Sequence, residues 1–393
     1  MGSQYNYIQV RREDKRYFCL QQNTFSLAWL LFFRKNTLLP MTVENVVKRG
    51  LLKRAIGVIR RQYYTCSNNI ETIINFVIVK YNSRKSELSV ELPFYGQVCM
   101  LVNKGYKIID LRRGVTIKVF RDDVDIPAIT NEMQCLQKGN LFDFAPSIRR
   151  MNINERWYEE EYIDGDRDYS AKPRNSSEIM KKFQEEIIPC LERLIFHQSL
   201  MTKHIKDYVD EIRSILSCDN SLREKSNAQY LEKIIAFIDS IAEQLRSKGD
   251  LPVYLALTHG DFCPANMLNT KRGLIILDWE SATYRSALFD FYSYFFFRSV
   301  HQKLPVDKLN NEIKVALPFF VSKLDSMAPD ISRNLKTFEE VYRWLYYIER
   351  VSMLMEREKH DTKHNIFEVI LRFIEVFKTY EDINTEKLTC SNL

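Results

Sequence analysis

The sequence predicts an α+β protein with a small β-rich lobe, a larger helical lobe and an extra basic N-terminal extension. Two changes of pattern support this fold class. Between residues 87 and 120, short runs rich in valine and isoleucine are separated by the turn signals Asn103-Lys104-Gly105 and Arg112-Arg113-Gly114, which is typical of antiparallel strands. After Gly165, apolar residues recur at three- and four-residue steps, which favours helices. We expect the extension at 1–90, the small lobe at 91–164 and the helical lobe at 165–393.

The elements of the two lobes follow in order along the chain. In the small lobe, Pro127 opens a helical pattern that runs through Gly139, and two further strands are expected at Ser147–Asn152 and Trp157–Ile163. The helical lobe is expected to begin with two long helical stretches, followed by two short strands and then by helices to the end. These ranges are Ser176–Cys218, Leu222–Lys248, Val253–Thr258, Leu274–Leu277 and the residues from Ala287 onward.

Length and composition exclude several classes of protein. The chain has 393 residues, of which 45% are hydrophobic and 27% charged, so it is neither disordered, nor collagen-like, nor a disulfide-stapled miniprotein. The eight cysteines are dispersed, without the spacing of a zinc finger. We therefore expect buried free thiols and a cytoplasmic location.

The basic charge is concentrated at the N-terminus. Residues 1–62 carry twelve basic and three acidic side chains, whereas the rest of the chain is mildly acidic, and we expect no nucleic-acid partner. Residues 42–61 have the pattern of an amphipathic helix, which either packs on the body with its basic face in solvent or attaches the protein to an anionic membrane through residues 1–62. The apolar run Phe25–Phe33 is too short to span a bilayer, which takes roughly 20 residues. This run either packs on the small lobe as part of its core or forms a second apolar patch that contacts the membrane.

The motif that carries chemistry lies between the two short strands of the helical lobe. It reads His259-Gly260-Asp261-Phe262-Cys263-Pro264-Ala265-Asn266, and Asp278 follows at the end of the next strand. Phosphoryl transfer to a hydroxyl needs a carboxylate that orients the acceptor and takes its proton, and oxygen ligands for Mg²⁺. The spacing from Asp261 to Asn266, followed by an aspartate on the next hairpin, matches that requirement.

This segment, with LIILDWE after it, resembles the aminoglycoside phosphotransferase and choline kinase superfamily, which has a bilobal protein-kinase-like fold. The resemblance implies an enzyme, a small-molecule kinase that uses ATP and Mg²⁺. It implies that Asp261 is the catalytic base, that His259 braces the catalytic loop, and that Asn266 and Asp278 hold the metal. Asp290 would pack beneath the loop, and Glu280 either faces substrate or caps the next turn.

The same resemblance predicts the nucleotide site in the small lobe. Lys118, in the strand Val115–Phe120, would hold the phosphates, and Glu132 would fix that lysine. The turn containing Gly105 would cover the phosphates, although it lacks a full glycine-rich motif. The backbone of Glu161, Tyr162 and Ile163 would meet the adenine.

The acceptor stays open at this stage. The superfamily phosphorylates hydroxyl groups of small molecules, so a small-molecule or glycan hydroxyl acceptor is expected. Aromatic residues crowd the helical lobe at 289–297 and 342–347, but most of them must be core rather than a cage for a cationic ligand. The alternative is a catalytically silent kinase-like protein that binds nucleotide or a partner.

Overall fold

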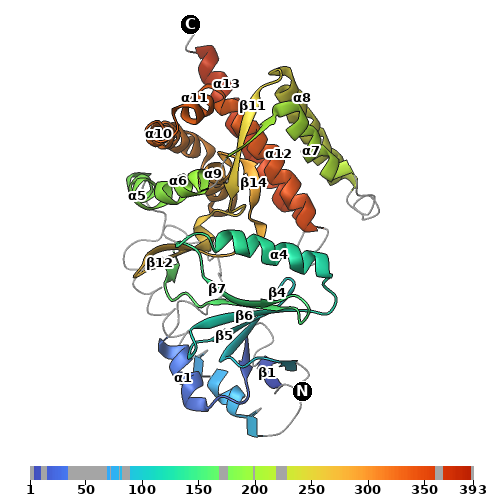
Figure 1. Cartoon of the computed structure of the whole chain (residues 1–393), viewed down its shortest axis with the longest axis vertical. Helices are drawn as coiled ribbons and strands as arrows, with labels where there is room; N and C mark the ends of the chain where they lie inside the picture. Colours follow the sequence, from blue (N-terminus) through green and yellow to red (C-terminus); the bar gives the residue numbers. More distant parts are fainter. Residues whose placement is uncertain are drawn as a thin grey trace. The chain divides into compact units, whose positions relative to one another are not determined.

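The chain folds into two compact units in a computed structural model (Figure 1). The sheet unit comprises Met1–Pro173 and Pro264–Glu280, and the helical unit comprises Arg174–Cys263 and Ser281–Leu393. We treat each unit by itself. The structure describes residues 4–9, 16–33, 69–70, 72–78, 80–81, 89–167, 176–197, 200–217, 228–358 and 366–390.

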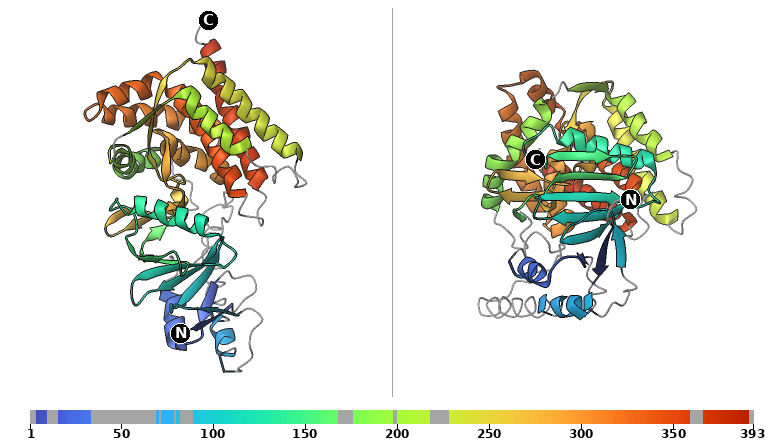
Figure 2. Two further views of the ribbon diagram at one scale, coloured as in Figure 1. Left: turned by 45° about the vertical axis from the view of Figure 1, so that its right-hand side comes forward. Right: turned by 60° about the horizontal axis from the view of Figure 1, so that its bottom comes forward.

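In the described part of the sheet unit, eight strands form one antiparallel sheet in the order β3-β1-β2-β4-β5-β6-β8-β7. Figure 2 shows these strands running side by side. The predicted strands between residues 98 and 161 are confirmed. β-branched and aromatic residues dominate β6 (VTIKVF), and short turns join β4 to β5 and β5 to β6. The bounds are β1 Tyr5–Gln9, β2 Arg16–Cys19, β3 Ser89–Leu92, β4 Val98–Val102, β5 Gly105–Asp110, β6 Val115–Phe120, β7 Ile148–Asn152 and β8 Trp157–Glu161.

The described parts of residues 1–90 belong to the sheet unit, so the boundary expected at residue 90 does not separate an extension from the small lobe. Strand β2 pairs with β4, and β1 pairs with both β2 and β3. Helix α1 (Thr24–Phe33) contains the apolar run, and its Leu27 and Leu31 lie in the core of the sheet unit. The expectation that this run packs as core is confirmed for those residues. The amphipathic segment 42–61 lies outside the described residues.

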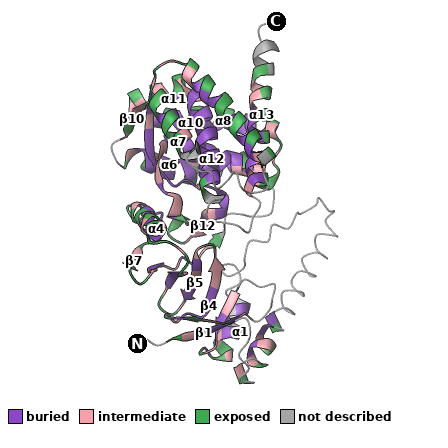
Figure 3. Cartoon of the chain, turned by 90° about the vertical axis from the view of Figure 1, so that its right-hand side faces the viewer, coloured by how far each residue is buried: buried purple, intermediate pink, exposed green. Residues whose placement is uncertain are grey.

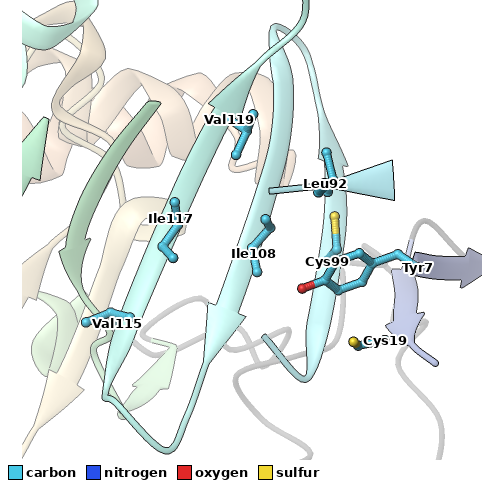
Figure 4. Packing of buried hydrophobic residues seen from close by; sticks show 8 residues of the cluster. All are labelled: Tyr7, Cys19, Leu92, Cys99, Ile108, Val115, Ile117 and Val119. Atoms are coloured by element: carbon cyan, nitrogen blue, oxygen red, sulfur yellow. The ribbon is translucent and has the colours of Figure 1, made fainter. Parts of the chain in front are cut away.

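Both faces of the central strands carry apolar clusters, and one face also carries two lysines. One face carries a hydrophobic cluster (Figure 4) that consists of Tyr7, Cys19, Leu92, Cys99, Ile108, Val115, Ile117 and Val119. Because side chains alternate along a strand, the neighbours of these residues point to the opposite face. Lys107 on β5 and Lys118 on β6 lie there, directly paired across the two strands. Functional groups of the sheet unit therefore gather on the face away from this cluster.

Helix α4 (Ile126–Gly139) begins where the sequence predicts. The Asp125 side chain caps it by accepting a hydrogen bond from Ala128 N at 2.9 Å, and Pro127 occupies its first turn. The helix ends at Gly139, which lies against the ring of Trp279. Trp279 follows a three-stranded sheet in the order β13-β12-β9, formed by β9 (Asp166–Arg167), β12 (Met267–Thr270) and β13 (Gly273–Ile276).

The helical unit surrounds a second three-stranded sheet in the order β10-β11-β14. Strand β10 interrupts the helical stretch that the sequence predicts from 176 to 218. The aromatic residues of α9 and α12 are almost all buried, which confirms that they form core; Figure 3 shows how much of α12 is buried. The bounds are α5 Ser176–Lys182, α6 Ile188–Phe196, β10 Met201–His204, α7 Ile205–Ser217, α8 Ala228–Ser247, β11 Pro252–Thr258, β14 Thr283–Ser286, α9 Phe289–Gln302, α10 Val306–Leu324, α11 Pro329–Thr337, α12 Glu339–Glu358 and α13 Ile366–Cys390.

Two further sequence expectations can be compared with the structure. Cys19, Cys99, Cys135, Cys190 and Cys263 are buried free thiols, as expected. None of the helices in the described ranges combines the length and the hydrophobicity needed to cross a bilayer.

Candidate active site

The centre of the sheet-unit site is an ion pair between Lys118 on β6 and Glu132 on α4. Both side chains are buried, with Lys118 6% and Glu132 1% exposed. Burial by itself lowers the pKa of Lys118, but the charges of Glu132 and Glu280 outweigh burial and raise it. Lys118 is therefore held as a cation on the face of the sheet opposite the hydrophobic cluster.

Lys107 is a second lysine at this site, and the sequence analysis did not single it out. Its ammonium lies 3.1 Å from a carboxylate oxygen of Glu160 and 3.9 Å from one of Asp278. Although burial works against its charge, these carboxylates raise the pKa of Lys107. The signal was present in the sequence, because a hairpin that turns at 111–114 pairs position 107 with position 118.

The turn between β4 and β5 contributes a third lysine. The ammonium of Lys104 lies 3.1 Å from Glu132. Gly105 is buried, and a Cβ there would lie 2.0 Å from the carbonyl oxygen of Val119, so close pairing with β6 requires glycine at this position. Close packing against β6 thus explains why position 105 is a glycine. The contact of Gly105 with a phosphate stays a prediction.

Asn266 and Asp278 flank the open end of the β12–β13 hairpin. Met267 pairs with Ile276 at the last ladder position, and the next backbone bond runs from Leu277 N to Asn266 O at 2.8 Å. Asp278 adopts a left-handed backbone conformation, with φ of 61°, and its side chain is 60% exposed. The hairpin therefore brings the backbone at position 266 next to the residue that precedes the exposed carboxylate.

The donor set at this hairpin end fits Mg²⁺. A carboxylate and an amide oxygen are hard ligands of the kind that Mg²⁺ takes, with its other positions filled by water and phosphate oxygens. In the described ranges, no group of three or more histidine, cysteine, aspartate and glutamate side chains is arranged to hold a metal ion. Asn266 and Asp278 would thus supply only part of the ligands of the ion, and the phosphates of a nucleotide and water would supply the others.

The sequence left two alternatives for Glu280, and in the structure its side chain lies next to Lys118. One of its carboxylate oxygens lies 3.5 Å from the ammonium of Lys118. Between Asp278 and Glu280, Trp279 is buried against the rings of Phe142 and Phe144 and donates a hydrogen bond from Nε1 to Ile276 O at 2.8 Å. The tryptophan fixes the segment that carries the two carboxylates.

Two of the three residues predicted to contact adenine use their backbone N–H groups in hydrogen bonds within the sheet unit. Glu161 N donates to Ser147 O and Tyr162 N donates to Gly114 O, so both of these donors are already engaged. Ile163 packs with Leu268 and Ile275 in a small apolar cluster, which could serve as a wall for a flat ring. The contact of the Glu161, Tyr162 and Ile163 backbone with adenine stays a prediction.

The loop at 259–261 in the helical unit is held by Asp290 at the start of α9. Its carboxylate accepts hydrogen bonds from His259 N at 2.6 Å and from Gly260 N at 3.1 Å. Burial raises the pKa of Asp290 to about 7, although these backbone donors oppose the shift. Gly260 has a φ of 85°, and a Cβ there would lie 2.5 Å from Ser281 O, so this turn requires glycine.

His259 and Asp261 are joined within the loop. The Asp261 backbone N–H donates to His259 Nδ1 at 3.1 Å, and the imidazole is fully buried. This geometry agrees with a bracing role for His259. The Asp261 side chain is 24% exposed, and Arg350 on α12 lies 3.3 Å from it. The sequence analysis did not select Arg350.

The structure thus assembles the predicted residues in two groups. Lys118, Glu132 and Asp278 meet in the sheet unit, in company with Lys107 and Glu280, and Asn266 lies on the same hairpin as Asp278. His259 and Asp261 meet in the helical unit, with Asp290 and Arg350.

Comparison with known proteins supports the resemblance drawn from the motif. The model of a phosphotransferase enzyme family matches residues 202–311, a segment that contains the loop at 259–266, Asp278 and Asp290. The chain therefore resembles the aminoglycoside phosphotransferase and choline kinase superfamily, and a β-rich unit together with a helical unit agrees with the expected kinase-like fold class. A search of curated proteins found no significant match.

Several solved structures are similar to the chain. Choline kinase LicA from Streptococcus pneumoniae is 14% identical, with 71% of this chain and 91% of that chain covered and a TM-score of 0.42. A choline kinase from Cryptosporidium parvum Iowa II is 15% identical, with 70% and 83% covered and a TM-score of 0.46. Aminoglycoside 2′-phosphotransferase-IIIa, in its GDP complex, is 11% identical, with 72% and 90% covered and a TM-score of 0.43.

Proposed function

We propose that the protein is an ATP-dependent phosphotransferase that moves the γ-phosphate to a hydroxyl group of a small molecule or glycan component. The observation that carries the proposal is the charged cluster of the sheet unit. In it the buried Lys118–Glu132 pair contacts Glu280, and Lys107, the cross-strand neighbour of Lys118, contacts the exposed carboxylate of Asp278. This is the set of groups that phosphoryl transfer requires: a fixed cation for phosphate oxygens and oxygen ligands for a metal ion.

Each group has a specific part in this proposal. Lys118 binds phosphate oxygens, and Glu132 prevents that side chain from turning away. Asn266 and Asp278 hold Mg²⁺, which offsets the charge of the triphosphate. Asp261 accepts the proton of the attacking hydroxyl and orients it, while His259 and Asp290 keep the loop in one conformation.

The aromatic residues of the helical unit bear on the choice of acceptor. The aromatic residues of α9 and α12 are buried apart from the partly exposed Phe297, so they do not form an open aromatic cage for a quaternary ammonium. These two helices therefore give no reason to propose a choline-like cation as the acceptor. The acceptor is defined only as a hydroxyl compound.

The experiment that tests the proposal combines binding and transfer. Calorimetry with Mg·ATP should show binding, and incubation with γ-labelled ATP and a panel of sugars, amino alcohols and aminoglycosides should label one class of hydroxyl compound. Failure to bind Mg·ATP would refute the nucleotide site. Binding without transfer to any member of the panel would favour the alternative, a silent kinase-like protein.

Attachment to an anionic membrane remains a separate proposal about location, and it rests on the sequence of residues 1–62 alone. Each basic side chain near an anionic surface contributes about 1 kcal/mol. Co-sedimentation with anionic vesicles at low salt should be lost when Lys53, Arg54, Arg60 and Arg61 are replaced by glutamine. Equal sedimentation with neutral and anionic vesicles would contradict it.

A further inference from the structure

Helices α12 and α13 share two arginine–aromatic contacts that are spaced by seven residues on each helix. The guanidinium of Arg343 lies 5.6 Å from the ring centre of Tyr380, and that of Arg350 lies 5.0 Å from the ring centre of Phe373. Both arginine side chains are buried, 8% and 6% exposed. The two positions are therefore closely matched in burial and in their aromatic contact.

The two arginines differ in what balances their charge. Arg343 is paired within the two helices, with Glu339 at 2.6 Å and Glu381 at 2.7 Å. Arg350 pairs with no carboxylate of the described residues of α12 and α13. Both of its terminal nitrogens lie 3.3 Å from one oxygen of Asp261, and Nη1 donates to Gly260 O at 3.2 Å.

These contacts complete the hydrogen bonding of Gly260. Its backbone N–H is bound by Asp290, and its carbonyl accepts from Arg350. A turn residue whose backbone N–H and carbonyl are both hydrogen-bonded has few alternative conformations. Arg350 also contacts the side chain that follows, so one guanidinium restrains both the turn and the carboxylate of Asp261.

From this geometry we infer that Arg350 is a positioning residue for Asp261, an inference that rests on the proposed function. It holds the carboxylate in the orientation from which the acceptor hydroxyl is engaged. Arg350 acts through Asp261, whose side chain stays partly exposed while the guanidinium is buried. Because small displacements of a reacting group are costly in rate, loss of this restraint lowers kcat and leaves nucleotide binding intact.

A second observation distinguishes Arg350 from an ordinary buried ion pair. Its Nε is buried without a hydrogen-bond partner, so the side chain does not reach the full set of bonds that a guanidinium can make. Buried donors are nearly always satisfied, and exceptions call for a reason. Here the orientation of the guanidinium toward Asp261 and Gly260 is that reason.

The test compares Arg350→Met with Arg343→Met as the matched control and Arg350→Lys as the conservative variant. We expect Arg350→Met to lower kcat at least tenfold with the Kd of Mg·ATP unchanged within twofold. Arg350→Lys should recover part of kcat. Arg343→Met should lose stability to urea to a similar degree, yet keep the wild-type kcat per folded molecule.

The pH profile gives a readout that a purely structural role would not change. A carboxylate that loses a neighbouring cation binds its proton more tightly. The acidic limb of kcat should therefore move to higher pH in Arg350→Met and stay in place in Arg343→Met. The other titratable or charged groups near Asp261 and Arg350 are the same in both variants; they are Asp290, Arg285, His301, Tyr346 and Arg372.

The outcomes separate this inference from the proposed function. If the wild type transfers phosphate and Arg350→Met keeps its kcat and pH profile, the positioning role is wrong and the function stands. Equal loss of kcat in Arg350→Met and Arg343→Met would likewise overturn it, because the effect would then follow from weakened helix packing. Absence of transfer by the wild type would overturn both.

Discussion

Lys107 on β5 and Lys118 on β6 lie directly opposite each other, and each is close to a carboxylate of the segment 278–280. Lys107 is 3.9 Å from Asp278, and Lys118 is 3.5 Å from Glu280. The two contacts join the sheet to the end of the β12–β13 hairpin through charge alone. The proposed phosphate and metal site requires cations and carboxylates close together, and these two contacts provide them.

The first prediction concerns Lys118. Lys118→Met leaves Glu132 buried with only Lys104 as a cationic partner, so the free energy of unfolding should fall by about 3 kcal/mol. The Kd of Mg·ATP should rise at least tenfold. The double variant Lys118→Met/Glu132→Gln should regain stability in urea but not affinity in calorimetry. Wild-type affinity in either variant would show that Lys118 does not hold the phosphates.

The second prediction concerns Asp278. Asp278→Asn suits the test because asparagine tolerates the left-handed backbone found there. Because the side chain is largely exposed, the free energy of unfolding should change by about 0.5 kcal/mol or less. Binding of Mg·ATP should weaken strongly, because the variant loses a charged metal ligand. An unchanged response of ATP affinity to Mg²⁺ would remove Asp278 from the metal site.

The third prediction concerns Asp290 and pH. Its pKa is about 7 when folded and 3.8 when unfolded, so the folded form binds the proton more tightly between these values. Its contribution to stability therefore falls as pH rises through this window and is constant above it. Between pH 5 and pH 7.5 the loss should be on the order of 3 kcal/mol.

Asp290→Asn should remove that dependence. Measured in urea, the free energy of unfolding of the wild type minus that of the variant should be larger at pH 5 than at pH 7.5. A difference that is the same at both pH values would mean that Asp290 does not titrate in this range.

The fourth prediction concerns the contact that anchors the Asp278 segment. A Cβ at Gly139 would lie 2.5 Å from the ring of Trp279, so Gly139→Ala should lower the free energy of unfolding by about 1–3 kcal/mol. Helix propensity alone would give a gain of about 1 kcal/mol. The sign of the change in thermal or urea unfolding therefore decides between the two effects.

Local sequence signals were sufficient for much of the sheet unit. Strands β4, β5 and β6 have turn residues between them, and Pro127 opens the helical pattern of α4, so the strand of Lys118 and the helix of Glu132 could be predicted from the sequence. Strands β1 and β2 were missed because they are short: although they pair with each other locally, their pairing with β3 and β4 spans about 80 residues. Pairing at such separations leaves no local pattern.

The candidate site was less predictable where charged residues act over long range. Glu349 and Arg350 are adjacent and look like an ordinary mixed-charge helix surface. In the fold both are buried: Glu349 accepts hydrogen bonds from the backbone and side chain of Ser286, whereas Arg350 contacts Asp261. Only tertiary packing assigns those partners, and burial is what distinguishes them from surface charges.

The central claim is most directly tested by phosphate transfer from γ-labelled ATP in the wild type and in Asp261→Asn, at saturating Mg·ATP and with one labelled hydroxyl acceptor. The account predicts that the wild type labels the acceptor, and that Asp261→Asn binds Mg·ATP equally but transfers at least about 10²-fold more slowly, the usual size of a general-base contribution. Transfer by Asp261→Asn at the wild-type rate would contradict the account.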